Sequence, residues 1–202
     1  MINHHYKCIF IHVPKCAGSS IEVAIDGKDW WGVGEPRITK CKKHLSASQS
    51  KVQYKKYWEE YTKFAFVRNP YSLQVSWYFF GQMDKVMPFK EYVKNKKVNR
   101  ASRYSHMPLD KKWSAIIPDI LTSYEYIAND GKIELDFVGR FEKLQGDFNL
   151  ICDRIGAPRK KLPHIHKSKN KHYTEYYDEE TRDIVTQRYA KDIEYFGYQF
   201  GK

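Results

Sequence analysis

A lysine, a glycine and two serines stand near the start of the chain, where a strand should give way to a helix. The apolar run 7–13 (KCIFIHV) predicts a buried strand, and the loop after it carries Lys15, Gly18, Ser19 and Ser20. Glycine lets the backbone approach a phosphate closely, and the N–H groups and dipole of a helix N-terminus favour negative charge. Lysine adds a positive charge, and the hydroxyls add donors. We expect an anion to bind here; the plainer interpretation is a tight turn with incidental polar residues.

A second strand-to-helix junction carries an arginine. The run 63–68 (KFAFVR) predicts another buried strand, which ends at Arg68. The Asn-Pro pair that follows supplies an N-cap and a first residue for a helix reaching about Gln82, with Ser76 about two turns in. The planar guanidinium suits phosphate, and a serine hydroxyl can add a hydrogen bond. Taken alone, Arg68 fits a structural ion pair equally well, and Ser76 fits helix packing.

The remaining patterns predict the elements that position these two loops. Amphipathic periodicity and caps (Ser46 or Ser48, Gly156, Asp178) predict helices over 46–61, 141–156 and 178–196. Two strand-like runs between residues 124 and 140 flank Asn-Asp-Gly, a hairpin signal. Because strand–loop–helix occurs twice, we expect an α/β fold with a central parallel sheet flanked by helices, in one domain spanning 1–202. Ligands of such sheets bind at the carboxyl ends of the strands, where both loops lie.

Composition limits the classes of protein to which the chain can belong. Its formal net charge of +11 suits an anionic partner, although the basic residues occur in short clusters of the kind that usually form solvated faces. No apolar run approaches the roughly 18 to 20 residues of a membrane span, and no signal-peptide pattern opens the sequence. The four scattered cysteines favour reduced thiols over a disulfide framework. We expect a cytoplasmic protein without a membrane span.

Two other functions and a metal site fit parts of the sequence pattern. Cys41 and His44 have the spacing of half a zinc site, but no second pair follows, so we expect no metal. A P-loop-type small-molecule or nucleoside kinase would need a Walker lysine and magnesium carboxylates, and neither pattern is evident. A nucleic-acid-binding protein would concentrate its basic residues on one face of a recognised module, and no such module occurs. These two functions remain the alternatives.

Together the motifs resemble those of the sulfotransferases that use 3′-phosphoadenosine 5′-phosphosulfate (PAPS), in particular the carbohydrate-type, family 2-like enzymes also found in bacteria. The segments that carry the resemblance are HVPKCAGSSI (12–21), FVRNPYSLQVSWY (66–78), VGRFEKLQGDF (138–148) and YYDEETRDIVTQRYAKDIEYFGY (176–198). The resemblance implies a P-loop-like α/β fold. It also implies transfer of a sulfuryl group from PAPS to an acceptor hydroxyl on a carbohydrate, without a metal and with 3′,5′-adenosine bisphosphate as product.

The resemblance also implies roles for residues at matching positions. Lys15 would contact the bridging oxygen and the 5′-phosphate, while Arg68 and Ser76 would hold the 3′-phosphate. The rest of the loop would line the 5′-phosphate (Cys16, Ala17, Gly18, Ser19, Ser20). A late segment, Lys167, Ser168 and Lys169, resembles a loop that folds over the cofactor in related enzymes; a solvated basic loop is the alternative. Leu73 stands where the family often has arginine, which weakens the match to the sugar-specific variants.

A histidine is the usual base for deprotonating an acceptor hydroxyl near neutral pH. The resemblance favours His44, which lies between the two cofactor motifs, over His106 in a loop on the acceptor side. Glu35 is a third candidate, since other branches of the family use glutamate. The other histidines are expected in a terminal tail (His4, His5), inside the first strand (His12) and in the late basic loop (His164, His166, His172). Sugar, lipid-linked glycan, tyrosine and phenol acceptors all fit the sequence.

Overall fold

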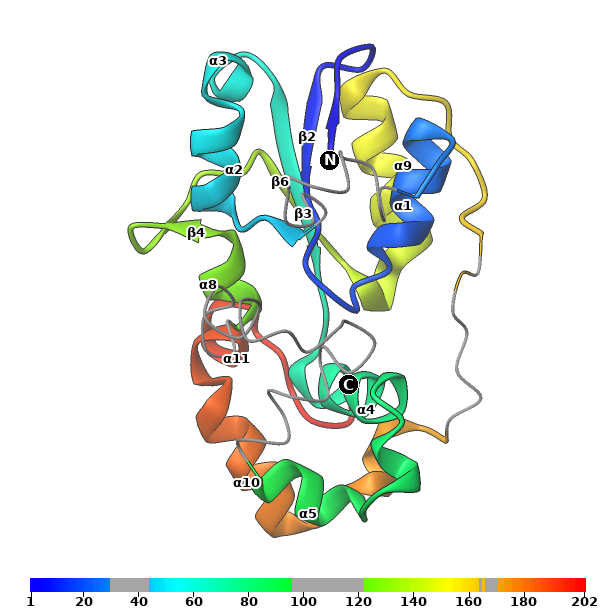
Figure 1. The fold of residues 1–202 in the computed structure, drawn as a ribbon, viewed down its shortest axis with the longest axis vertical. Helices are drawn as coiled ribbons and strands as arrows, with labels where there is room; N and C mark the ends of the chain where they lie inside the picture. The colour runs from blue at the N-terminus through cyan, green and yellow to red at the C-terminus, as the bar shows by residue number, and fades with distance from the viewer. Residues whose placement is uncertain (30–43, 96–121, 164, 166–170) are drawn as a thin grey trace, which may run out of the picture. The chain divides into compact units, whose positions relative to one another are not determined.

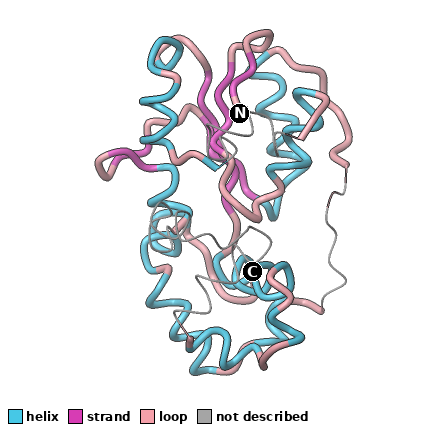
Figure 2. The backbone as a smooth tube through the Cα atoms, viewed as in Figure 1, coloured by secondary structure: helices cyan, strands magenta, loops and turns pink. Residues whose placement is uncertain are grey.

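The computed structural model describes residues 1–29, 44–95, 122–163, 165 and 171–202. The chain forms two compact units: unit 1 comprises Met1–Arg68 and Ser123–Lys167, and unit 2 comprises Asn69–Thr122 and Ser168–Lys202. All strands of the described residues belong to unit 1, whereas the described part of unit 2 is helical (Figure 2). The single domain expected from the sequence stays a prediction.

A four-stranded sheet forms the centre of unit 1. Its order is β1 (Ile2–Asn3), β2 (Cys8–Ile11), β3 (Thr62–Val67) and β6 (Phe137–Arg140). Strands β2, β3 and β6 run parallel, and β1 pairs antiparallel with β2 at the edge. In Figure 1, α1 (Gly18–Asp26) and α9 (Leu144–Ile155) lie on one side of the strands, and α2 (Ala47–Gln53) and α3 (Lys55–Trp58) on the other. The prediction of an α/β fold with a central, mainly parallel sheet flanked by helices is confirmed.

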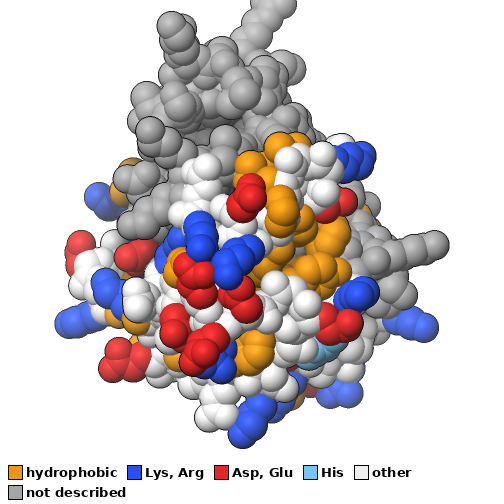
Figure 3. All heavy atoms as spheres, turned by 90° about the horizontal axis from the view of Figure 1, so that it is seen from below, with side chains coloured by type: hydrophobic (Ala, Val, Ile, Leu, Met, Phe, Trp, Pro, Cys, Tyr) orange, Lys and Arg blue, Asp and Glu red, His pale blue; other side chains and the backbone are white. Residues whose placement is uncertain are grey.

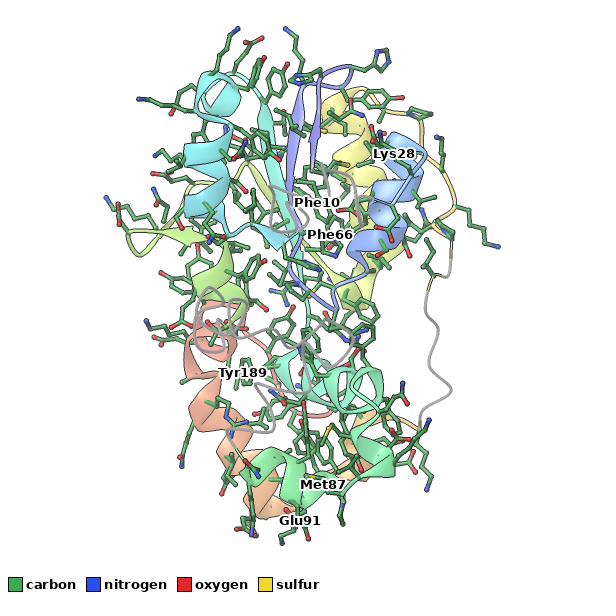
Figure 4. The ribbon with its side chains drawn as sticks, viewed as in Figure 1. Phe10, Lys28, Phe66, Met87, Glu91 and Tyr189 are labelled. Carbon is green, nitrogen blue, oxygen red and sulfur yellow. The ribbon has the colours of Figure 1, made fainter. Side chains whose placement is uncertain are left out.

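The two predicted strands owe their positions to continuous apolar sequence. All four residues of β2 are buried, as are the last five of β3, which is typical of parallel strands covered on both faces. The Phe10 and Phe64 rings stack at 4.9 Å between centroids on neighbouring strands. Phe10 and Phe66, both marked in Figure 4, belong to this core, with 2% and 0% of their surface exposed. Burial of these side chains stabilises the edge at which the loops emerge.

Two of the predicted helices of unit 1 are shorter than their patterns. The helix expected over 46–61 is α2 followed by α3, divided at Tyr54 (φ −113°, ψ 27°), and Ser46 closes a capping box at its start. The helix expected over 141–156 begins with the 3₁₀ turn η3 (Phe141–Lys143) before α9. Gly156 ends α9 with φ 69°, the left-handed conformation predicted for it.

The predicted hairpin is confirmed in a reduced form. After α8 (Ser123–Ile127), strands β4 (Ala128–Asn129) and β5 (Lys132–Ile133) pair antiparallel. Asp130 and Gly131 form the turn with φ of 48° and 74°, the conformation that favours Asp-Gly in tight hairpins. Each strand has only two residues, and the later strand-like sequence forms β6 of the central sheet instead.

The expectation that His4 and His5 lie in a terminal tail was wrong. Residues Ile2–Asn3 form β1, and the amino group of Met1 donates to the carbonyl of Phe10 at 2.9 Å. The imidazole Nδ1 of His4 lies 2.9 Å from the hydroxyl of Tyr61. A two-residue strand is too short to show periodicity, so its sheet partner could not be read from the sequence.

Unit 2 contains six described helices of varied length. They are α4 (Pro70–Phe80), η2 (Met83–Lys85), α5 (Phe89–Lys94), η4 (Tyr173–Tyr176), α10 (Glu179–Arg188) and α11 (Ala190–Phe196). As predicted, Asn69 caps α4, its side chain accepting from the N–H of Tyr71, and Pro70 is the first helical residue. The predicted helix 178–196 is capped by Asp178 but divided at Tyr189 (φ −113°, ψ 26°) into α10 and α11.

A buried hydrogen bond and ion pairs link the helices of unit 2. Tyr189, marked in Figure 4, is fully buried, and its hydroxyl accepts from the amide of Gln74 at 2.5 Å. Lys90 pairs with both Asp178 (2.7 Å) and Glu180 (3.0 Å), which links α5 to the start of α10. Figure 3 shows the face that carries these two helices, where acidic and basic side chains are interspersed.

Candidate active site

The loop after β2 has the backbone of an anion-binding turn. Lys15 and Ala17 both adopt the left-handed conformation, with φ of 64° and 63°, and α1 begins immediately afterwards at Gly18. Left-handed residues next to a helix start turn successive N–H groups toward one side, which forms an anion-binding concavity. No acidic residue occupies the first turn of α1. The structure therefore places the predicted loop residues at a positive helix end (Cys16, Ala17, Gly18, Ser19, Ser20).

Packing against His12 requires glycine at position 18. A Cβ atom added at Gly18 would lie 2.1 Å from Nε2 of His12, far inside van der Waals contact. The His12 side chain is 4% exposed, and its Nδ1 lies 2.8 Å from Oε1 of the fully buried Glu22 on α1. We assign the donor role to Nδ1–H of His12 and the acceptor role to the carboxylate oxygen of Glu22. A buried His–Glu pair therefore packs against the start of the loop.

Arg68 lies beside the same loop. It follows the last residue of β3, the parallel neighbour of β2, so the two loops leave the sheet at the same edge. Its Nη1 donates to the main-chain carbonyl of Lys15 at 3.2 Å. The guanidinium stacks on the ring of Phe141, 3.9 Å from the ring centroid. Arg68 is thus held in place from two sides.

The Lys15 ammonium occupies an environment that favours its neutral form. Burial, and to a smaller extent the positive charge of Arg68, lower its pKa from 10.5 to about 8, with Cys16 acting in the opposite direction. An ammonium whose pKa is lowered in this way gains more from an arriving anion than a fully solvated one. Two neighbouring cations at one edge of a sheet are suited to a ligand with several negative charges.

His44 lies at the same edge, although the sequence places it far from both loops. Its Nδ1–H donates to the main-chain carbonyl of His12 at 3.2 Å. The imidazole rings of His44 and His12 meet edge to face at 4.5 Å, with 73° between their planes. The hydroxyl of Tyr126 donates to the main-chain carbonyl of His44. With its proton on Nδ1, the ring has its lone pair on Nε2, the tautomer that can accept a proton there.

The other predicted site residues are placed as follows. Ser76 is half-buried on α4 in unit 2, and Leu73 on the same helix is 5% exposed. Both therefore belong to the helix that the motif predicted. Several candidates lie outside the described residues (Glu35, His106, Lys167, Ser168, Lys169).

Two contacts of the site were missed by the sequence analysis. Glu22 was not singled out, and His12 was regarded only as a structural histidine. An acidic residue on the buried face of the helix after the loop was the available signal, because an unpaired carboxylate would be costly there. The stacking of Phe141 on Arg68 joins segments more than seventy residues apart, and no pattern in the sequence predicted it.

Neither a metal-binding cluster nor a membrane-spanning helix occurs among the described residues. They contain no group of three or more His, Cys, Asp or Glu side chains that could hold a metal ion. None of the helices they form is long and apolar enough to cross a membrane. Cys8, Cys16 and Cys152 are buried free thiols, and burial raises the pKa of Cys8 to about 12.

Comparisons with known proteins bear on the identity of the chain. A crystal structure of a sulfotransferase from Alicyclobacillus acidocaldarius is similar to it, with 12% sequence identity, a TM-score of 0.46, and coverage of 93% of this chain and 92% of that one. No curated protein sequence matches significantly. The model of the sulfotransferase family matches residues 1–199, almost the whole chain. The chain therefore belongs to the sulfotransferase family.

Proposed function

We propose that the protein transfers the sulfuryl group of PAPS to a hydroxyl group of a carbohydrate acceptor. Family membership supports sulfuryl transfer. The observation that carries the choice of donor is the pairing of two cations at one sheet edge, with Arg68 bonded to the carbonyl of Lys15 in an anion-binding turn. PAPS carries phosphate groups at both ends of its ribose, so it needs two cationic subsites close together.

In this proposal the loop after β2 binds the 5′-phosphate. The N–H groups at the start of α1 and the hydroxyls of Ser19 and Ser20 donate to its oxygens. Lys15 binds the oxygen that bridges this phosphate to sulfur. The bond between sulfur and the bridging oxygen breaks, and that oxygen keeps the electron pair. Lys15 stabilises the negative charge that develops there, which lowers the barrier.

Arg68 binds the 3′-phosphate in this proposal. The guanidinium is held by Phe141 and by the loop carbonyl, so little side-chain freedom is lost when an anion binds. Ser76 is assigned to the same phosphate by the motif alone, and so are Lys167, Ser168 and Lys169 to the cofactor. Those assignments stay predictions, as does a cytoplasmic location.

His44 is the general base of the proposal. The acceptor oxygen forms the new bond to sulfur, and its proton passes to Nε2 of His44. The hydrogen bond from Nδ1–H to the His12 carbonyl supports this role, because it selects the tautomer with a basic Nε2. The carbohydrate nature of the acceptor rests on the resemblance of the motifs, and Leu73 in place of an arginine is the departure from the sugar-specific pattern.

The test is transfer of label from PAPS carrying ³⁵S to a panel of acceptors: oligosaccharides, a tyrosine peptide and a simple phenol. Labelled oligosaccharide, with 3′,5′-adenosine bisphosphate released in equal amount, is expected. A Lys15→Ala variant should release little of either product. Label on the phenol or the peptide alone would overturn the choice of acceptor, and no label on any acceptor would overturn the proposal.

A further inference from the structure

The buried Glu22–His12 pair has no step of its own in the reaction proposed above. Glu22 has no exposed surface and His12 has 4%, and their side chains meet at 2.8 Å. Placing an ionisable pair in a protein interior costs solvation that an apolar pair of the same size would not lose. Two contacts of the His12 ring show where this pair acts, because they are made with Gly18 of the loop and with His44.

The first of these contacts is with the phosphate-binding turn. The Nε2 edge of the His12 ring lies against the Cα of Gly18, so closely that even a methyl group would overlap it at 2.1 Å. Gly18 is the first residue of α1, and the N–H groups around it form the anion-binding end of that helix. The position of the imidazole therefore limits the path that the turn can take.

The second contact is with the candidate base. The His12 ring meets the His44 ring edge to face at 4.5 Å, and the His12 carbonyl accepts Nδ1–H of His44 at 3.2 Å. The main-chain carbonyl of His12 thus contacts Nδ1 of His44, and the His12 ring contacts the His44 ring. Its own ring is fixed in turn by the Glu22 carboxylate, which accepts from Nδ1–H.

We propose that the Glu22–His12 pair is the positioning unit of the active site, setting the phosphate-binding turn at Gly18 and the ring of His44 together. The inference rests on the proposed function only for the roles of these two parts, the turn as the binding site of PAPS and His44 as the general base. Glu22 and His12 act through Gly18 and His44, and neither touches the reacting atoms. Groups that hold a catalytic side chain in one rotamer and tautomer typically affect activity by one to two orders of magnitude.

The first experiment compares Glu22→Ala with Glu22→Gln in the sulfuryl-transfer assay. Alanine removes the acceptor for Nδ1–H of His12, whereas glutamine keeps an oxygen in its place. We expect Glu22→Ala to lower kcat by roughly 10- to 100-fold, and Glu22→Gln to restore most of it. Both variants are assayed at a temperature where each is fully folded by circular dichroism.

Asn3→Ala is the matched control for a loss of stability. Asn3 Nδ2 donates to Oδ1 of Asp26 at 2.8 Å, so this variant also removes one side-chain hydrogen bond between the sheet and α1, at the other end of the helix. Its kcat should equal that of the wild type. Wild-type kcat in Glu22→Ala, or an equal fall in Asn3→Ala, would overturn the positioning role.

The second experiment is a double-mutant cycle between Gly18 and His12, read as the unfolding temperature without any ligand. His12→Asn keeps an N–H donor for Glu22 but removes the ring edge that lies on Gly18. Gly18→Ala should lower Tm by several degrees in the wild type and by much less in the His12→Asn background, since only contacting residues couple. Equal decreases in both backgrounds would show that His12 does not set the turn.

The third readout is the tautomer of His44, measured by ¹⁵N NMR and assigned by comparison with His44→Ala. The wild type and Glu22→Gln should show a protonated Nδ1, and Glu22→Ala a mixture of tautomers. An unchanged tautomer in Glu22→Ala would contradict the inference. The cycle and the NMR need no substrate. They therefore decide the positioning role even if the wild type transfers no sulfuryl group, a result that would reject the proposed function alone.

Discussion

The guanidinium of Arg68 donates to the main-chain carbonyl of Lys15 at 3.2 Å, which joins the ends of two parallel strands. The arginine that follows β3 therefore holds the loop that carries Lys15. The two positive charges repel each other, and this repulsion adds to burial in lowering the pKa of Lys15. Like charges held this close are typical of functional sites.

Replacing Lys15 by methionine should stabilise the ligand-free protein at neutral pH. The pKa of Lys15 is about 8 in the folded protein and 10.5 as its ordinary value, so between these values the unfolded chain binds more protons. Protonated Lys15 therefore destabilises the folded protein most below about pH 8. This destabilisation decreases as pH rises from about 8 to 10.5. We expect Lys15→Met to unfold at least about 2 to 4 °C above the wild type at pH 7, with the difference shrinking toward pH 10.5.

The control is Lys132→Met, which removes an exposed lysine on β5 and should leave Tm nearly unchanged. Thermal unfolding of the three proteins is followed by circular dichroism at pH 7 and pH 10. A Lys15→Met variant less stable than the wild type at pH 7 would show that the ammonium is not destabilised in the folded protein.

Lys15→Ala should lower kcat rather than only raise KM. An interaction that strengthens as the leaving oxygen gains charge acts in the transition state, and its loss costs roughly 10² to 10³ in kcat. In the wild type, kcat/KM should fall as pH rises through about 8, where free Lys15 loses its proton. Initial-rate kinetics across pH 6 to 9.5 measure both effects. A mutant with unchanged kcat and a higher KM for PAPS would make Lys15 a binding residue only.

Two strands of the central sheet, β2 and β3, could be predicted because continuous apolar runs are typical of buried parallel strands. The starts of helices could also be predicted, since Ser46, Asn69 and Asp178 are all N-caps in the structure. The breaks within two of the helices could not be predicted. Tyr54 and Tyr189 are buried aromatic residues whose packing overrides a helical pattern that continues on both sides of them.

The candidate site was predictable where it depends on topology alone. Lys15 and Arg68 follow neighbouring parallel strands, so their proximity follows from the strand order. The contact between His44 and His12 joins residues 32 positions apart, and the motifs predicted for His44 only a place between them in the chain. Pairs such as His12 and Glu22 form only when a helix packs on the sheet. Neither residue type predicts which partner it will have.

His44→Asn should separate the base from the structural contact of His44. Asparagine can place an N–H near the position of Nδ1 and still donate to the His12 carbonyl, but it offers no nitrogen that accepts a proton. We expect kcat to fall by roughly 10² to 10⁴, with the affinity for 3′,5′-adenosine bisphosphate unchanged. The rate of the wild type should rise with pH on the acid side, because an imidazole must be neutral to accept the proton.

His106→Ala is the companion variant, and it should act mainly on KM for the acceptor. Full activity in His44→Asn together with an inactive His106→Ala would transfer the role of base to His106. Full activity in both would direct attention to Glu35.

Gly139→Ala should destabilise the sheet. A Cβ at Gly139 on β6 would lie 2.5 Å from Cε1 of Phe66, a side chain with no exposed surface. Overpacking of this kind costs about 1 to 3 kcal/mol of unfolding free energy. Gly146→Ala on α9 is the matched control, because nothing lies within 4 Å of its added methyl group, and it should stabilise by about 0.5 to 1 kcal/mol. Urea denaturation measures both, and a neutral Gly139→Ala would show that the packing is looser than described.

The central claim is that the site at the ends of β2 and β3 recognises a nucleotide with phosphates at both the 3′ and 5′ positions. Isothermal titration calorimetry of the wild type and Arg68→Ala with 3′,5′-adenosine bisphosphate and with AMP tests it most directly. Charge-assisted hydrogen bonds contribute about 1.5 to 3 kcal/mol each, so the bisphosphate should bind the wild type at least about tenfold more tightly than AMP. That preference should largely disappear in Arg68→Ala. Equal affinities of the wild type for the two nucleotides would contradict the account.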